Sequence, residues 1–374
     1  MAGFPIPVSV LTGFLGAGKT TLLNRLLKDP GLADTAVIIN EFGEVAIDHL
    51  LVEQASDGII QLSDGCLCCT VRGDLVDTLA DLVDRLQTGR IAKLARVVVE
   101  TTGLADPAPV LQSIMAHPAL VQAFRLDGVI TLVDAVNGEA TLDTHVEAVK
   151  QAAVADRIVL TKTDLAGTAE VEALRARLKQ INPGAVVLDV NEAGTGAAAL
   201  FNCGLYNPET KSADVRRWLG DEAAHDQDHH YDHHHHDGDE DHHHHHDHGH
   251  RHDTRVRSHS LVHDGPVPFS VIEMFLDLVR STHGEKLLRM KGVIELMEDP
   301  SRPLVIHGVQ KILHPPARLP AWPDGQRGTR LVLITLDMPN DYIQRLFAAF
   351  TNKPSVDTPD RAALEANPLA IAGL

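Results

Sequence analysis

Three of the four cysteines in this 374-residue chain lie within four positions, at Cys66, Cys68 and Cys69 in the stretch SDGCLCCTVR. A thiolate is a soft ligand, which selects Zn²⁺ and Cu⁺ over Mg²⁺ or Ca²⁺. A disulfide between such close neighbours is strained, and a nucleophilic cysteine needs a histidine base nearby. Packing of small thiols in a core is a further alternative. The clustered thiols therefore suggest metal binding or catalysis before a disulfide, whereas the fourth cysteine, Cys203, is predicted to be a packed side chain.

The stretch GFLGAGKT at residues 13–20 points to phosphate binding, because it matches the pattern G-x-x-x-x-G-K-[ST] in full. A predicted strand precedes it and a predicted helix follows, which is the context that such a loop requires. Its N–H groups face phosphate oxygens, Lys19 places a charge beside the β and γ phosphates, and the Thr20 hydroxyl takes one position on Mg²⁺. The predicted nucleotide-binding residues of this loop are Gly13, Gly16, Ala17, Gly18, Lys19, Thr20 and Thr21.

The stretch TKTD at residues 161–164 indicates which base is bound. It follows the predicted strand DRIVL, at the place where phosphate-loop GTPases carry N-K-x-D. The Asp164 carboxylate accepts hydrogen bonds from guanine N1–H and the 2-amino group, whereas adenine offers no donor at either place. The stem of Lys162 lies along the base. Thr161 stands where asparagine is usual, and this change is expected to loosen the loop without removing the discrimination by Asp164.

Two acidic stretches supply candidates for the chemistry at the γ-phosphate. Glu100 ends the predicted strand RVVVE, where it is expected to hold Mg²⁺ through water or to orient the attacking water, and Gly103 brings an N–H to the γ-phosphate. The stretch NEFGEVAID at residues 40–48 is the expected switch segment. Its Glu41 is the candidate fourth ligand of the thiolate metal site. Lys19, Glu100 and Glu41 are thus the predicted catalytic residues.

Short apolar runs alternate with amphipathic ones from residue 7 to residue 189, which predicts an α/β fold: a doubly wound, mainly parallel sheet. VSVLTG, AVIIN, GIIQL, RVVVET, GVITLVD and RIVLTK are the expected strands. We expect a phosphate-loop domain over residues 1–206 and a disordered histidine- and aspartate-rich linker over 207–256. A smaller α+β domain then covers 257–352, followed by a tail over 353–374.

The linker has a composition that binds metals. Fifteen of the 23 histidines fall between His225 and His252, interleaved with aspartates. Neutral imidazoles bind Zn²⁺, Ni²⁺, Co²⁺ and Cu²⁺, so the segment is interpreted as a metal reservoir or capture arm, with an inert solvated linker as the alternative. The net charge of -18 argues against a nucleic-acid partner. No apolar run is long enough to predict a membrane span and no secretory signal is evident, so a cytoplasmic protein is expected.

The motifs TGFLGAGKTTLLNRLL, IINEFGEVAID, GCLCCTVRGDL, ETTGLADP and TKTD occur in the order found in one family. Together they resemble the CobW-type branch of phosphate-loop GTPases, and KLLRMKGVIEL with RPLVIHGVQKILHPP resembles its C-terminal domain. The resemblance runs from residue 7 to residue 338. It implies GTP hydrolysis coupled to delivery of a transition metal, most often zinc, and cobalt in the cobalamin branch. Thr161 and Ala46, the latter at a position where glycine is common, depart from the family pattern.

These observations lead to the hypothesis of a GTP-gated metallochaperone that binds GTP, Mg²⁺ and Zn²⁺ (or Co²⁺) and delivers the metal to a client metalloprotein. GTP would order the switch segment, bring Glu41 toward the thiolates and tighten the metal site; hydrolysis would release the metal. Passive metal storage by the histidine-rich segment, a cobalt chaperone for cobalamin synthesis and a regulatory GTPase are the alternatives. A homo-oligomer is left open.

Overall fold

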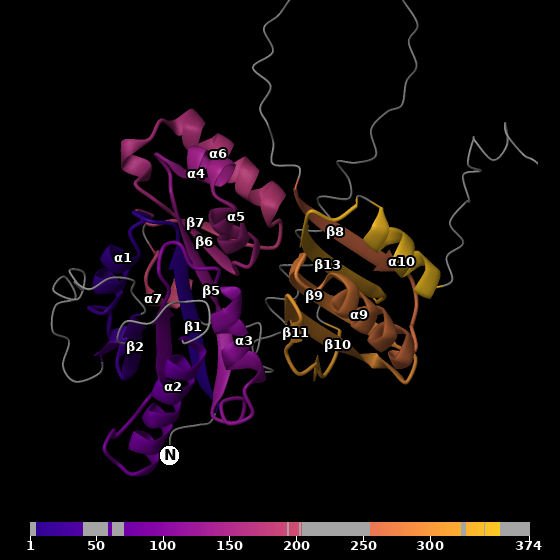
Figure 1. Ribbon diagram of the computed structural model, residues 1–374, viewed down its shortest axis with the longest axis horizontal. Coiled ribbons are helices and arrows are strands. Elements are labelled where there is room, and N and C mark those ends of the chain that lie inside the picture. Colours follow the sequence, from indigo (N-terminus) through magenta and orange to yellow (C-terminus); the bar gives the residue numbers. More distant parts are fainter. Residues whose placement is uncertain are drawn as a thin grey trace, which may run out of the picture.

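A computed structural model describes residues 5–39, 59–61, 71–192, 194–201, 203, 255–322, 327–339 and 341–351. These residues form two β-sheets, each with its own helices (Figure 1). Several predictions lie outside the described residues: the three clustered cysteines, Glu41 and its neighbours in the switch segment, the histidine-rich segment and the tail. The domain boundaries proposed above therefore stay predictions.

The first sheet has seven strands in the order β3-β2-β4-β1-β5-β6-β7, and every pairing between them is parallel. This confirms the predicted parallel α/β fold. Because the strands run in one direction, their carboxyl ends all lie at one edge of the sheet. The strands are β1 (Ile6–Gly13), β2 (Thr35–Ile39), β3 (Ile59–Gln61), β4 (Arg96–Glu100), β5 (Phe124–Asp134), β6 (Arg157–Thr161) and β7 (Val186–Asp189).

Both faces of this sheet are apolar, which is why its strands are nearly continuous runs of valine, isoleucine and leucine. On β4, for example, Val97 and Val99 join one buried cluster and Val98 joins another on the opposite face. The helices that cover the two faces are α1 (Lys19–Leu26), α2 (Val71–Gln87), α3 (Ala108–Ala116), α4 (Gly138–Thr144), α5 (Val146–Ala153), α6 (Thr168–Ile181) and α7 (Ala197–Leu200).

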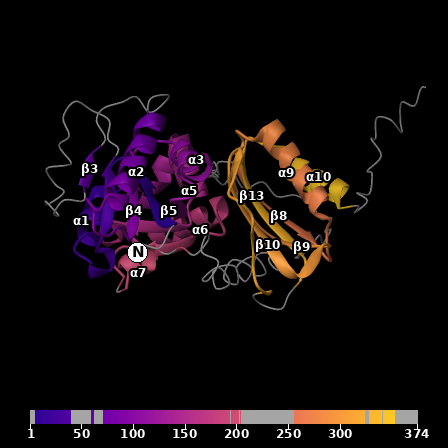
Figure 2. The same ribbon diagram turned by 90° about the horizontal axis from the view of Figure 1, so that it is seen from below.

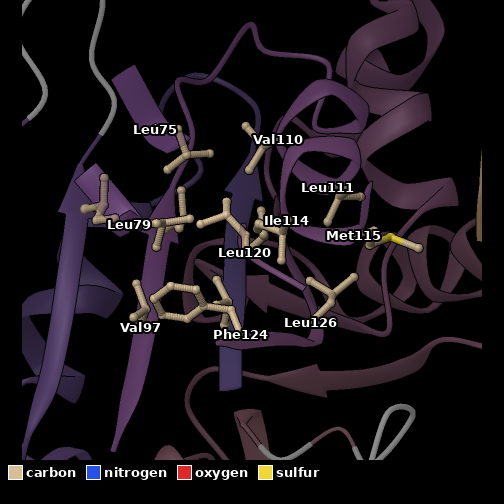
Figure 3. Close-up of a cluster of buried hydrophobic side chains, with 14 of the residues drawn as sticks. Leu75, Leu79, Val97, Val110, Leu111, Ile114, Met115, Leu120, Phe124 and Leu126 are labelled. Atoms are coloured by element: carbon tan, nitrogen blue, oxygen red, sulfur yellow. The ribbon is translucent and has the colours of Figure 1, made fainter. Parts of the chain in front are cut away.

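The cluster between α2, α3 and the sheet is shown in Figure 3. Leu75 and Leu79 of α2 meet Leu111 and Ile114 of α3 over Phe124 of β5, and each is at most 2% exposed. Burying one such side chain stabilises the fold by roughly 1.5–3 kcal/mol. Packing of this kind fixes α3 in place, although its nine residues are too few to have been recognised as a helix in the sequence.

The second sheet is antiparallel, in the order β11-β10-β9-β13-β8 with β12 paired to β10. Its strands are β8 (Val256–His263), β9 (Leu287–Leu296), β10 (Asp299–Val309), β11 (Ile312–Leu313), β12 (Ala317–Arg318) and β13 (Thr329–Leu336). Helices α9 (Phe269–His283) and α10 (Tyr342–Phe350) cover one face (Figure 2). Gly284 caps the end of α9 with a right-handed φ of -58°, which any residue can adopt. It is needed for a different reason: a Cβ there would lie 2.4 Å from the Lys311 side chain.

The two sheets are joined through buried contacts rather than standing apart. The face of the antiparallel sheet away from α9 and α10 meets α3, α5 and α6 (Figure 2). Leu288 and Ile334 enter an apolar cluster of the first domain. At the polar centre of the contact, Asp156 pairs with Arg289 and with Lys291, whose Nζ lies 3.1 Å from Asp156 Oδ1. Among the described residues, no helix combines the length and apolar character needed to cross a bilayer.

Candidate nucleotide site

The phosphate loop lies between the end of β1 at Gly13 and the start of α1 at Lys19. Gly13 has φ 143°, and a Cβ there would stand 2.5 Å from the carbonyl oxygen of Leu132 on β5. No larger residue fits this position without moving the neighbouring strand. Gly18 caps α1 with φ 90° and has no side chain to cap the helix, and a helix N-terminus of this kind favours anions.

The Lys19 ammonium is held over the loop. Its Nζ donates to the carbonyl oxygens of Gly13, at 2.8 Å, and Phe14, at 3.2 Å. This places a positive charge beside the loop. The loop therefore offers the charge and the donors that a polyphosphate requires.

Thr20 and Glu100 meet, although 80 positions separate them in the chain. The Thr20 hydroxyl donates to Glu100 Oε1 at 3.2 Å, and Glu100 is 5% exposed at the end of β4. A hydroxyl and a carboxylate this close are oxygen ligands of the kind that Mg²⁺ prefers beside a phosphate loop. The donor set present here thus fits a magnesium ion.

The loop after β4 lies directly against the phosphate loop. A Cβ on Gly103 would be 2.7 Å from the backbone nitrogen of Leu15, so only glycine permits this approach. Helix α5 holds the loop from behind: Gln151 Nε2 donates to the carbonyl oxygens of Gly103, at 3.2 Å, and Ala105, at 3.0 Å. Lys150 binds Asp106 at 2.9 Å. The Gly103 loop is therefore positioned by side chains that the sequence did not identify.

Thr161, which stands where asparagine is usual, connects the predicted guanine-binding loop at residues 161–164 to the phosphate loop. Its hydroxyl donates to the Ala17 carbonyl at 2.9 Å in a buried position. Lys162 follows with φ 57°, and its Nζ binds Asp134 Oδ2 at 2.7 Å. Burial raises the pKa of Asp134, but hydrogen bonds from Lys162 and Asn137 outweigh it and hold that pKa below its usual range. The threonine thus joins the two loops rather than loosening them.

Asp164, the predicted guanine ligand, is held by residues beyond β7 that sequence reasoning missed. Asn191 Nδ2 donates to Thr163 Oγ1 at 3.1 Å and to Asp164 Oδ1 at 3.3 Å. The Thr163 hydroxyl in turn donates to Asp189 Oδ1 at 2.9 Å. The signal was available: the polar run DVNEAG follows β7, and the carboxyl ends of parallel strands share one edge.

A cavity of about 200 Å³ lies behind the phosphate loop. Its lining runs from Lys162 and Asp134 to Gln151. Phe14 forms part of its wall and stacks on His145, with the ring centroids 4.4 Å apart. The cavity therefore connects the base side of the site with the residue that holds the Gly103 loop.

The fold brings Lys19, Thr20, Glu100, Gly103, Lys162 and Asp164 to one edge of the sheet. Cys66, Cys68, Cys69 and Glu41 fall outside the described residues. Across the described part of the chain, no three His, Cys, Asp or Glu side chains are grouped as a metal site. Cys203 is 5% exposed, and burial together with Asp156 raises the pKa of its thiol to about 12, which confirms a packed side chain.

Known proteins match this chain over both sheets. Residues 7–189 match the family described as CobW/HypB/UreG, nucleotide-binding domain, and residues 256–351 match the cobalamin synthesis protein cobW C-terminal domain. The zinc chaperone YjiA of Escherichia coli K12 is 35% identical over 344 residues, which are 92% of this chain and 98% of that protein.

Two further matches are similar in extent. The zinc chaperone CobW of Sinorhizobium sp. is 30% identical, with 88% of this chain and 93% of the relative covered. The crystal structure of Zn(II)-bound YjiA GTPase from E. coli superposes with a TM-score of 0.66 at 30% identity, covering 93% of this chain and 99% of that one.

Proposed function

The chain belongs to the CobW/HypB/UreG family of P-loop GTPases, and from this membership we propose that it is a zinc metallochaperone, which binds Zn²⁺ and passes it to a client protein. The relatives YjiA and CobW are named zinc chaperones, and a fission-yeast relative that matches 48% of this chain at 35% identity is named a zinc-regulated GTPase metalloprotein activator. The chain is a GTPase. Zinc as cargo, the ligand set and delivery to a client are the proposal.

For GTP hydrolysis, we propose a role for each residue at the carboxyl edge of the sheet. Lys19 and the loop N–H groups hold the β and γ phosphates, and the Gly103 N–H binds the γ-phosphate. Thr20 and Glu100 would hold Mg²⁺, which supplies neutralising charge at the phosphates. Asp164 accepts from guanine, and Asn191 and Thr163 keep its carboxylate in place.

For zinc, we propose Cys66, Cys68 and Cys69 as the thiolate ligands and Glu41 as the ligand that responds to GTP. One observation carries this proposal: Ile39, the last residue of β2, pairs with Gln61, the last residue of β3, and with Glu100. The segment with Glu41 leaves β2, and the thiol segment leaves β3. Neighbouring strands lie about 4.8 Å apart, so both segments begin within about 10 Å of Glu100.

The experiment that tests this proposal measures zinc affinity by chelator competition, with the protein bound to a non-hydrolysable GTP analogue or to GDP, both with Mg²⁺. We expect tighter zinc binding with the analogue. Replacing Cys66, Cys68 and Cys69 together by serine should abolish the tight site. The matched control is Cys203→Ala, which removes a buried thiol elsewhere and should leave zinc stoichiometry unchanged.

Two results would contradict the proposal. Equal zinc affinity in the two nucleotide states would rule out gating, because a ligand shifts only an equilibrium whose states it distinguishes. Tight binding that survives the triple serine variant would rule out the thiolates. Repeating the titration with Co²⁺ decides which metal the site prefers.

A metal store is the second candidate, and the concentration of histidines in residues 225–252 favours it. Without a fixed geometry, such a tract should bind several ions weakly and exchange them quickly. Deleting residues 226–252 separates the two functions. A store would lose most of its zinc capacity, whereas a chaperone would keep one tight site and its GTPase activity.

A further inference from the structure

Helix α3 and the Gly103 loop form one mechanical unit. Only residues 104–107 separate Gly103 from the start of α3 at Ala108. Asp106 Oδ1 accepts from the Ala108 N–H at 3.0 Å, while its other oxygen binds Lys150. A small displacement of α3 should therefore also move Gly103. This glycine packs so closely on the phosphate loop that an added Cβ would lie 2.7 Å from the Leu15 nitrogen.

The turn between β10 and β11, which belongs to the antiparallel sheet, reaches α3. Gln112 of α3 donates from Nε2 to Gln310 Oε1 at 2.9 Å, across 198 positions of the chain. Val309 is 3% exposed within the apolar cluster of the first domain, and Ile312 packs against the same cluster. The turn thus contributes both a hydrogen bond and apolar contacts to the packing of α3. Figure 1 shows β11 on the side of the antiparallel sheet that faces α3.

Gln310 is in a conformation that side chains seldom adopt. Its φ is 51°, which falls in the left-handed region and costs a residue with a Cβ about 1 kcal/mol or more. Glycine would relieve this strain but could not reach Gln112. A strained residue that makes a specific contact points to a role for its side chain.

The antiparallel sheet can act as a fixed support because a second contact anchors it. Asp156, between α5 and β6, binds Arg289 and Lys291 of β9, and all three side chains are at most 8% exposed. The turn at Gln310 and this buried charge cluster contact the first domain at different elements, α3 and the α5–β6 connection. Rotation of one sheet against the other would have to break one of them.

We propose that Gln310 is a positioning residue for GTP hydrolysis: through Gln112 it holds α3, and α3 holds the Gly103 N–H where the γ-phosphate binds. The C-terminal domain thereby sets how well the first domain distinguishes GTP from GDP. GDP lacks the γ-phosphate, so its binding does not depend on Gly103.

The test uses the full chain with Gln112→Ala, Gln310→Gly and the double variant. Each single variant should lower kcat/KM for GTP about fivefold, the factor of one typical neutral hydrogen bond, with a matching loss of affinity for a non-hydrolysable GTP analogue, and should leave GDP affinity unchanged. The double variant should be no worse than either single variant, because both remove the same contact. Gln310→Asn, which tolerates the left-handed conformation, should lie between wild type and Gln310→Gly.

The matched control is Gln344→Ala, which removes a hydrogen bond to His259 within the C-terminal domain, away from α3. It should change neither kcat nor the ratio of analogue to GDP affinity. The proposal is overturned if Gln310→Gly and Gln112→Ala leave that ratio unchanged, whether or not the melting temperature falls. Losses that multiply in the double variant would equally overturn it.

Discussion

Removing the charge of Asp156 should destabilise the junction between the two domains more than any single surface change. This carboxylate is 6% exposed, accepts from the Val129 N–H at 2.9 Å, and is the shared partner of Arg289 and Lys291. Burial raises its pKa, but the two cations outweigh that effect and keep it below its usual range. Asp156→Asn preserves the shape and leaves two buried cations without a counter-charge. Removing one partner of a buried ion pair costs about 3–5 kcal/mol.

The matched control removes the whole cluster. Asp156→Leu combined with Arg289→Met and Lys291→Met replaces every charge by an apolar group of similar volume. Exchanges of this kind are neutral or stabilising in other proteins. We therefore expect the triple variant to recover most of the stability that Asp156→Asn loses, even though it differs from wild type at three positions rather than one.

Urea unfolding at pH 7 is the assay. Trp322 donates to the Pro300 carbonyl at 2.8 Å inside the C-terminal domain, and the chain has one other tryptophan, Trp218. A Trp218→Phe background makes Trp322 fluorescence report on that domain. A loss below about 1 kcal/mol for Asp156→Asn, or a triple variant less stable than the single one, would refute the reasoning.

Three further predictions concern single side chains. Thr161→Val should weaken the binding of GTP and of GDP alike by about fivefold to tenfold, because it leaves the Ala17 carbonyl without its donor. Thr161→Ser keeps the hydroxyl and should bind both nucleotides as wild type does; equal affinities for all three proteins would contradict this. Asp164→Asn should weaken GTP binding by roughly a hundredfold or more, since two charge-assisted hydrogen bonds are lost. The variant should bind xanthosine triphosphate more tightly than GTP, which competition titrations would show. Burial and Arg289 lower the pKa of Lys291 to about 8 from 10.5, so between these values the unfolded chain holds a proton that the folded chain lacks, and stability rises with pH. We therefore compare the free energy of unfolding of wild type with that of Lys291→Met by urea titration, with both proteins carrying Cys203→Ala. The difference should shift in favour of wild type by at most about 3 kcal/mol from pH 7 to pH 10.5, and no shift would contradict the lowered pKa.

The sequence predicted the long strands and most of the amphipathic helices well, but three short helices, α3, α4 and α5, were missed. α2 and α6 repeat apolar residues at helical spacing over 17 and 14 residues, which gives a clear periodic signal. α3, α4 and α5 have seven to nine residues each, too few turns for that signal. Tertiary packing against the sheet, rather than local preference, holds them in place. Those three helices nevertheless carry Gln112, Gln151 and the support of the Gly103 loop.

The strand at residues 287–296 shows a different limit. Its sequence LLRMKGVIEL predicts a strand, and the structure has one there. Nothing in its pattern indicates that Arg289 and Lys291 are buried, because long cationic side chains are mostly exposed in proteins. Their burial depends on Asp156, 133 positions before Arg289, which compensates the charge.

From the amino-acid order alone, a phosphate loop, a guanine-type base loop and a parallel sheet could be derived. These features are local: a glycine pattern permits one backbone curl, and a run of apolar residues indicates one buried strand. Only the tertiary structure decided that Thr20 meets Glu100, that Thr161 binds the Ala17 carbonyl, and that Gln310 reaches α3. Such contacts join residues 80 to 198 positions apart, and they are set by how strands align at one sheet edge and how two sheets dock, which no local spacing records.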